Sequence, residues 1–271
     1  MDTRTREQKL CDLLAAEEDY VPFAIEAFLY RRKQVRLGSV LRSLMGTARV
    51  RAIHAYYVKN DISAFKQNAY LATRLSLASV GQDGGSTFEV ADDLFYALLS
   101  DSSGAINAMA AVEVPQLLQS RMNPLHSRFY VYMLQMAIRG ENEIVQQMIR
   151  KVATNGRKPE RIEAAAGRDF FSLLLKRDQA GLEERIKTKH AKPKNQDVET
   201  ENFLSFFGTL EAKLCWLKGI PVQIDSPWVP MELMPVQPLD HYDDVYDFLK
   251  PEWVPPRQGL FGKISRWLSS D

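Results

Sequence analysis

The chain is poor in cysteine, has no long hydrophobic run and carries almost no net charge, and each absence excludes a class of protein. Two cysteines, Cys11 and Cys215, in 271 residues are too few for a disulfide framework, and we interpret both as buried, reduced thiols. No apolar run reaches the roughly 18 residues that a membrane-spanning helix requires. A net charge of +1 provides no overall field that would attract nucleic acid or a membrane surface. The first nine residues lack the apolar core of a secretory signal, so we expect a cytoplasmic protein.

Local motifs for catalysis and metal binding are also missing. The glycine-rich stretch 81–86 lacks the Gly-Lys-Ser/Thr ending of a phosphate-binding loop, and we interpret it as a plain connection. Neither cysteine has a histidine near it in sequence, and there is no Gly-x-Ser-x-Gly motif. Of the four histidines only His241, which lies among aspartates, offers any setting for a metal ion. We therefore expect no cofactor, no metal and no enzyme, although a site assembled between helices would leave no local motif.

What the sequence does contain is helical periodicity. Hydrophobic residues make up 45% and charged residues 25%, as in ordinary globular proteins. Spacing predicts a first helix over residues 4–19, a second opened by Pro22, a break at Gly38 and a third helix over about 39–58. Strand patterns are nearly absent outside Val222 to Ile224, so the predicted fold class is all-α.

Polar breaks recur between the predicted helices at a period of about forty residues. They centre near residues 60, 101, 140 and 177, and each joins an apolar helix end to a new apolar helix. Short connections place neighbouring helices antiparallel, so we predict an array of helical hairpins, a solenoid-like bundle, in a single domain over residues 1–271. The polar, basic stretch 187–197 has no periodicity and is predicted to be a flexible loop.

Residues 203–236 form the stretch around which we expect the earlier helices to close. A strongly apolar helix is predicted to end at Gly219, followed by a short extended segment near 222–225. Prolines then fix the path of the chain around Trp228, which we expect to be a buried anchor.

The segment Glu211 to Leu233, EAKLCWLKGIPVQIDSPWVPMEL, resembles the closing signature of the immunity protein 49 family. The residues that carry this resemblance are Gly219, Val222, Asp225, Pro227, Trp228 and Pro230, followed by Leu233. The resemblance implies a mostly helical bacterial protein that is encoded beside a polymorphic toxin, binds it and silences it.

Charge is distributed unevenly along the chain. Eight basic residues and no acid lie between Arg31 and Lys59, whereas five acids and one base lie between Leu239 and Trp253. These are solvated helix faces or partners of each other; an RNA-binding role for the basic stretch would call for interleaved aromatics, which it lacks. The acidic stretch also carries aromatics, which suit a surface that binds the basic cleft of a toxin. Its candidate toxin-binding residues are Asp240, Tyr242, Asp243, Asp244, Tyr246 and Asp247.

Residues 255–271 are predicted to form an amphipathic C-terminal helix that docks on the domain, on a partner or on a membrane surface. For the whole chain we expect an immunity protein that occludes a cytoplasm-acting toxin, such as a nuclease or a nucleotide-targeting effector. The alternatives are a helical-repeat scaffold for another protein and an enzyme with a site between helices.

Overall fold

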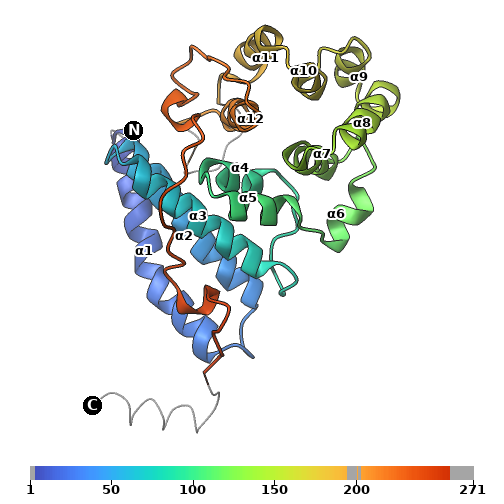
Figure 1. Cartoon of the computed structure of the whole chain (residues 1–271). Coiled ribbons are helices and arrows are strands. Elements are labelled where there is room, and N and C mark those ends of the chain that lie inside the picture. The colour runs from blue at the N-terminus through green and yellow to red at the C-terminus, as the bar shows by residue number, and fades with distance from the viewer. Residues whose placement is uncertain (1–3, 194–199, 201–202, 257–271) are drawn as a thin grey trace, which may run out of the picture.

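The computed structural model describes residues 4–193, 200 and 203–256. Over these residues the chain is helical and contains no strand, which confirms the all-α prediction. Figure 1 shows a long three-helix unit at one side and a curved row of shorter helices that returns to the centre of the molecule. Among the helices described, none is both long and apolar enough to cross a membrane.

The three long helices are α1 (Arg6–Tyr30), α2 (Leu37–Tyr57) and α3 (Ile62–Ser79). The expected boundary at Pro22 is wrong, since α1 runs through it as one helix that starts from a capping box at Thr5. Proline removes one backbone donor from a helix, which is tolerated where water can reach the carbonyl left over. Pro22 lies on the exposed side of α1, so this condition is met.

Gly38 lies in the first turn of α2, so the break expected at this residue comes earlier, over residues 31–36. Its N–H donates to the carbonyl of Asp83 at 2.9 Å. A Cβ at position 38 would come within 2.2 Å of the Gly85 nitrogen. The glycines of the 81–86 stretch therefore allow two backbones to touch, which supports its interpretation as a connection.

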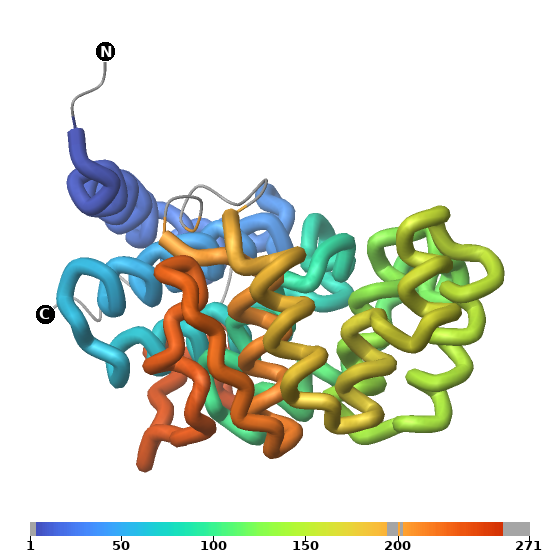
Figure 2. Tube along the Cα trace, turned by 90° about the horizontal axis from the view of Figure 1, so that it is seen from above, coloured from blue at the N-terminus to red at the C-terminus, as the bar shows by residue number. Residues whose placement is uncertain are grey.

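The shorter helices follow in chain order around the curve, as the colour progression in Figure 2 shows. Their bounds are α4 (Asp92–Leu99), α5 (Ser103–Ala110), α6 (Pro115–Ser120), α7 (Ser127–Arg139), α8 (Asn142–Asn155), α9 (Lys158–Ala165), α10 (Phe170–Lys176), α11 (Gln179–Arg185), the π-helix η1 (Ile186–His190), α12 (Phe206–Leu217), and the 3-10 turns η2 (Met231–Leu233) and η3 (Asp247–Leu249). Because α12 packs against α4, the row closes on itself, and residues of α7, α10 and α12 line a pocket.

The four predicted hairpin turns are confirmed, and they share one backbone feature. Each contains a residue in the left-handed region: Asn60 (φ 53°), Asp101 (φ 59°), Gly140 (φ 78°) and Arg177 (φ 55°). Such a residue ends one helix, and the next residue starts the following one. The side chains of Asp61, Ser102 and Asp178 accept a backbone N–H of the new helix as its cap.

Arg177 is the one long side chain among these left-handed residues. Its guanidinium donates to the carbonyls of Lys218 at 3.0 Å and Gly219 at 2.9 Å. The last hairpin turn is thereby tied to the end of α12. These bonds give a physical reason for a strained backbone at a residue that is not glycine.

The stretch after α12 is built as expected, except at its anchor. Val222, Ile224 and Val229 are buried at 0%, 3% and 2% exposure. Trp228 is only partly buried, so the expectation that it anchors the crossing is wrong. Its neighbour Val229 takes that role, because the proline-fixed path points the smaller side chain inward.

Two further expectations concern the cysteines and the terminal segments. Cys215 is buried as expected, but Cys11 is exposed on α1. The first residues of the expected loop 187–197 belong to η1, while 194–197 lie outside the described residues. The expected C-terminal helix over 255–271 also lies outside them, apart from residues 255 and 256.

Candidate functional site

The acidic-aromatic stretch lies in a segment without regular helix that we name the strap, residues 231–256. It runs along α3 in Figure 1 and passes over the start of α5. Beneath it, the Asp101 carboxylate forms ion pairs with Lys213 Nζ at 2.6 Å and with Lys66 Nζ at 2.9 Å. All three side chains are at most 5% exposed.

These buried lysines hold the strap by its main chain. Lys213 donates to the carbonyl of Leu233 at 2.7 Å, and Lys66 donates to that of Gln237 at 2.6 Å. Burial lowers the pKa of Lys213, and the nearby Asp101 carboxylate partly opposes this effect. Two ammonium groups share one carboxylate, so the strap carbonyls supply the remaining stabilisation of the buried charge.

Asp244, one of the expected toxin-binding residues, is partly buried and bound to side chains of α3. Arg74 donates to it through two nitrogens, at 2.7 and 3.0 Å, and the Tyr70 hydroxyl donates at 2.9 Å. Burial alone would raise the pKa of Asp244, but these donors lower it below its ordinary value.

The two tyrosines of the expected surface also point inward. Tyr242 packs on Tyr70 with ring centroids 4.8 Å apart, and its hydroxyl donates to the Ser100 carbonyl at 2.5 Å. Tyr246 is 8% exposed and stacks on Phe248 at 5.0 Å. Tyr242 thereby fastens the strap to the helices beneath it, whereas the stack of Tyr246 on Phe248 lies within the strap.

Of the residues expected to bind the toxin, three carboxylates remain at the surface: Asp240, Asp243 and Asp247. Asp243 is held by its main chain, which exchanges two hydrogen bonds with the Gln67 amide. Asp247 has an 80% exposed side chain, with Lys250 Nζ at 2.5 Å. These carboxylates form an acidic edge whose position is set by the inward-facing residues between them.

Of the two alternatives for the charged stretches, pairing of this acidic stretch with the basic stretch 31–59 is wrong for the described residues. In the described chain Arg36 pairs with Asp83, Arg51 pairs with Glu18, and Arg49 pairs with two aspartates at the start of α4. The basic stretch therefore joins α2 to α1, to α4 and to the glycine-rich connection.

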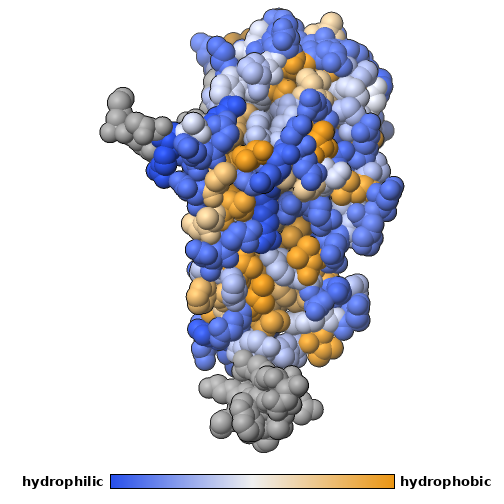
Figure 3. Space-filling view, turned by 90° about the vertical axis from the view of Figure 1, so that its left-hand side faces the viewer, coloured by the Kyte–Doolittle hydropathy of each residue, from blue (hydrophilic) through white to orange (hydrophobic). Residues whose placement is uncertain are grey.

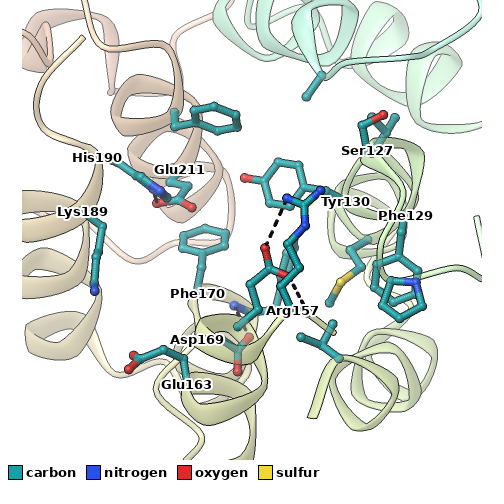
Figure 4. Close-up of a pocket in the computed structure, with 18 of the residues that line it drawn as sticks. Ser127, Phe129, Tyr130, Arg157, Glu163, Asp169, Phe170, Lys189, His190 and Glu211 are labelled. Atoms are coloured by element: carbon teal, nitrogen blue, oxygen red, sulfur yellow. Dashed lines mark hydrogen bonds and ion pairs between the residues drawn. The ribbon is translucent and has the colours of Figure 1, made fainter. Parts of the chain in front are cut away.

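The pocket lined by α7, α10 and α12, drawn in Figure 4, has a volume of about 650 Å³, and no local motif predicted it. Its aromatic lining consists of Phe129, Tyr130, Phe170, Phe171, Phe206 and Phe207. Val90, Leu125 and Phe207 are 53%, 53% and 40% exposed and form an apolar lip. The sequence feature that could have indicated this aromatic lining is the Phe-Phe pair at the start of both α10 and α12.

Most charged groups of the pocket are paired within the protein. His190 Nδ1 lies 2.8 Å from an oxygen of Glu211, which is 1% exposed. Arg185 lies 3.6 Å from Glu163. The hydroxyl of Tyr130 is buried beside Glu211; burial first, and then this carboxylate, raises its pKa well above the ordinary value.

This arrangement suits an apolar or aromatic side chain of a partner, since ring faces are plentiful and the charges already have partners. A histidine held by a carboxylate is also the arrangement of a general base. The pocket is therefore where the enzyme alternative would have its site. Sequence reasoning missed His190 because it falls in the stretch expected to be a flexible loop.

The described residues contain no group of three or more His, Cys, Asp or Glu side chains placed to hold a metal ion. His241 is exposed, and its neighbour Asp244 is bound to Arg74. The setting that the sequence suggested for a metal ion is not assembled by this part of the chain.

Comparison with known families gives one match. The family model described as immunity protein 49 matches residues 50–233, about two-thirds of the chain. No curated protein and no solved structure matches. The pocket lies within the matched residues, whereas α1 and nearly all of the strap lie outside them.

Proposed function

The chain belongs to the immunity protein 49 family, and from this premise we propose that it binds a cognate bacterial toxin and neutralises it by occlusion. The family match is the observation that carries the proposal. An inhibitor that works by covering another protein needs a rigid, positioned surface rather than a reactive group. The closed array and the strap fastened by buried lysines are consistent with such a surface.

We further propose that the toxin acts in the cytoplasm on nucleic acid or a nucleotide. Proteins that hold phosphates do so with basic clefts, and carboxylates complement these clefts. The strap presents Asp240, Asp243 and Asp247 at its surface, and its inward-facing residues hold them in place. Of the six residues expected to bind the toxin, we propose that these three exposed ones make direct contact and that Tyr242, Asp244 and Tyr246 support them.

A second candidate function is that of a scaffold for another protein. The apolar lip and aromatic lining of the pocket favour it, because exposed apolar surface of this kind marks interaction sites. The two candidates differ in the partner, which is a toxin only in the first.

The test uses the toxin domain encoded beside this gene, immobilised for kinetic binding measurements. Replacing Asp240, Asp243 and Asp247 together by Asn removes three charges and keeps the side-chain shapes. We expect an unchanged melting temperature, because exposed carboxylates contribute little to stability. The association rate should fall at least tenfold at low ionic strength, since charge steers the encounter.

The matched control replaces three exposed carboxylates elsewhere on the molecule by Gln: Glu113, Glu143 and Glu184. It should associate like the wild type. If the wild-type chain does not bind the toxin, the proposed function fails. If the wild type binds but the strap variant associates equally fast, the acidic edge is not part of the contact.

A further inference from the structure

One side of α1 faces solvent with an unusual combination of side chains. We define the α1 face as Asp12, Ala16, Asp19, Tyr20, Phe23 and Glu26. Starting at Asp12, these residues follow steps of three and four that keep them on one side of a helix. The other side of α1 buries Leu10, Val21, Ala24 and Phe28. Figure 3 shows the side of the molecule on which α1 lies, where hydrophobic residues stand among hydrophilic ones.

The aromatic residues of the α1 face are exposed, unlike those of the strap. Phe23 is 66% and Tyr20 50% exposed, whereas Tyr246 of the strap is 8% exposed. Aromatic side chains that enter a partner's pocket supply much of the binding energy of an interface. By this criterion α1 is better placed than the strap to anchor a partner.

The face is also acidic. Between Leu10 and Tyr30 the chain has five carboxylates and no basic residue. Asp19 has no ion-pair partner among the residues that the structure describes. Asp12 pairs with Arg4 and Glu26 pairs with Arg31, but in both pairs the side chains are about half exposed, so the carboxylates stay open to a partner.

The strap packs against the buried side of α1, opposite the α1 face, near the C-terminal end of the helix. Phe28 packs on Phe248 at 4.5 Å and on Trp253 at 5.9 Å. Asp247 of the acidic edge directly precedes Phe248. The acidic edge thus lies near the C-terminal end of α1, and α1 lies wholly outside the family match at 50–233.

We propose that the α1 face is the anchor for the toxin's basic, phosphate-binding cleft, with Phe23 and Tyr20 inserted and the carboxylates in the positions of substrate phosphates. This inference rests on the proposed function and adds the place and the chemistry of the contact. A second copy of this chain does not suit the α1 face, because two acidic α1 faces brought together would repel each other. Residues 257–271 contain Lys263 and Arg266 and follow the strap, so they are the competing occupant that the experiment must separate.

The first measurement is the affinity of the neighbouring toxin for a variant carrying Tyr20→Ser and Phe23→Ser. Both side chains are at least half exposed, so we expect the variant to fold and melt like the wild type. Its dissociation constant should rise about 30-fold or more, the effect of losing a binding hot spot. The matched control, Leu118→Ser with Met122→Ser, changes side chains that are 41% and 46% exposed in α6 and just after it, and should bind as the wild type does.

The second measurement is the rate of thiol alkylation at two sites on α1. Native Cys11 is exposed, and Ala16→Cys in a Cys11→Ser background places a thiol in the α1 face. The two sites are five residues apart, or about 140° around the helix. Cys215 is buried and burial raises its pKa, so it should not react. Added toxin should slow alkylation at position 16 at least tenfold and leave Cys11 nearly unchanged.

Three results would overturn the inference and leave the proposed function standing. One is an unchanged dissociation constant between the toxin and the variant carrying Tyr20→Ser and Phe23→Ser. Another is a thiol at position 16 that alkylates slowly in the free full-length chain and fast once residues 257–271 are deleted. That result would mean that residues 257–271 cover the α1 face. The third is a dimer of the free chain that the double serine variant abolishes. If the wild-type chain does not bind the toxin at all, the proposed function itself fails.

Discussion

At the scale of single residues, the buried Lys66–Asp101–Lys213 cluster joins the hairpin array to the strap. Its geometry is fixed by a carboxylate between two ammonium groups at 2.9 and 2.6 Å. Buried ion pairs of this kind contribute little net stability when complete, but they are costly to break. The cluster therefore makes the position of the strap depend on one carboxylate.

We predict that Asp101→Asn destabilises the protein by about 3–5 kcal/mol, because it leaves two buried cations without an anionic partner. Asparagine tolerates the left-handed backbone and has nearly the same shape, so the loss reports the charge. Urea unfolding measures it, with Asp240→Asn on the exposed edge as the control. A loss below about 1 kcal/mol would mean that the strap carbonyls alone stabilise the two lysines.

Tyr70 gives a prediction about alkaline pH. Burial, together with the bond to Asp244, raises its pKa to about 12. The ordinary value in an unfolded chain is about 10. A raised pKa in the folded state contributes stability that is present below pH 10 and is lost as pH rises from about 10 to 12.

Tyr70→Phe should therefore lose less stability than the wild type between pH 10 and 12. Lys213, whose pKa burial lowers, acts in the opposite direction, but both proteins retain it. Measuring the free energy of unfolding of the wild type and of Tyr70→Phe between pH 10 and 12 tests this prediction. Parallel pH profiles would show that Tyr70 titrates alike in the folded and unfolded states.

At the scale of elements, the hairpin turns decide where helices reverse. Gly140 has φ 78° and open space around its Cβ position, while Gly46 lies inside α2, also with open space, at an ordinary φ. We predict that Gly140→Ala costs about 1–2 kcal/mol, because a Cβ is strained in the left-handed region. Gly46→Ala should instead stabilise by about 0.5–1 kcal/mol, since alanine favours the helix. Melting temperatures of the Gly140→Ala and Gly46→Ala variants test this prediction. Equal shifts in the two variants would rule out strain at the positive φ of residue 140 as the cause.

The elements that could be predicted from sequence are those with local causes. The turns at residues 60, 101, 140 and 177 were predictable because a polar break and a cap residue lie within a few positions of each other. The continuity of α1 through Pro22 was not, because it depends on which side of the helix faces water. The choice of Val229 over Trp228 as anchor depends on packing against helices far away in sequence.

The candidate sites were predictable only in part, for the same reason. The acidic character of the strap is visible in the sequence, but the partners that turn Asp244 and Tyr242 inward come from α3 and the α4–α5 turn. The pocket combines α7, α10 and α12, so His190 and Glu211 gave no local motif. The exposure of Phe23 could not be read from periodicity alone, because α1 has apolar residues on two sides.

At the scale of the whole molecule, the family match covers the curved array and the crossing after α12, whereas α1 and the strap flank it. These flanking parts present the acidic surfaces, and the matched part contains the pocket. We propose that the array is the rigid support and that α1 and the strap determine which toxin the chain binds.

The central claim is that the chain neutralises its toxin by binding and not by chemistry. The most direct measurement is a titration of the purified toxin's activity with the purified chain, at concentrations well above their dissociation constant. Inhibition by binding predicts a linear loss of activity that is complete at one chain per toxin molecule. Activity that persists with the chain in excess, or that is lost at far less than one chain per toxin as turnover would produce, would contradict it.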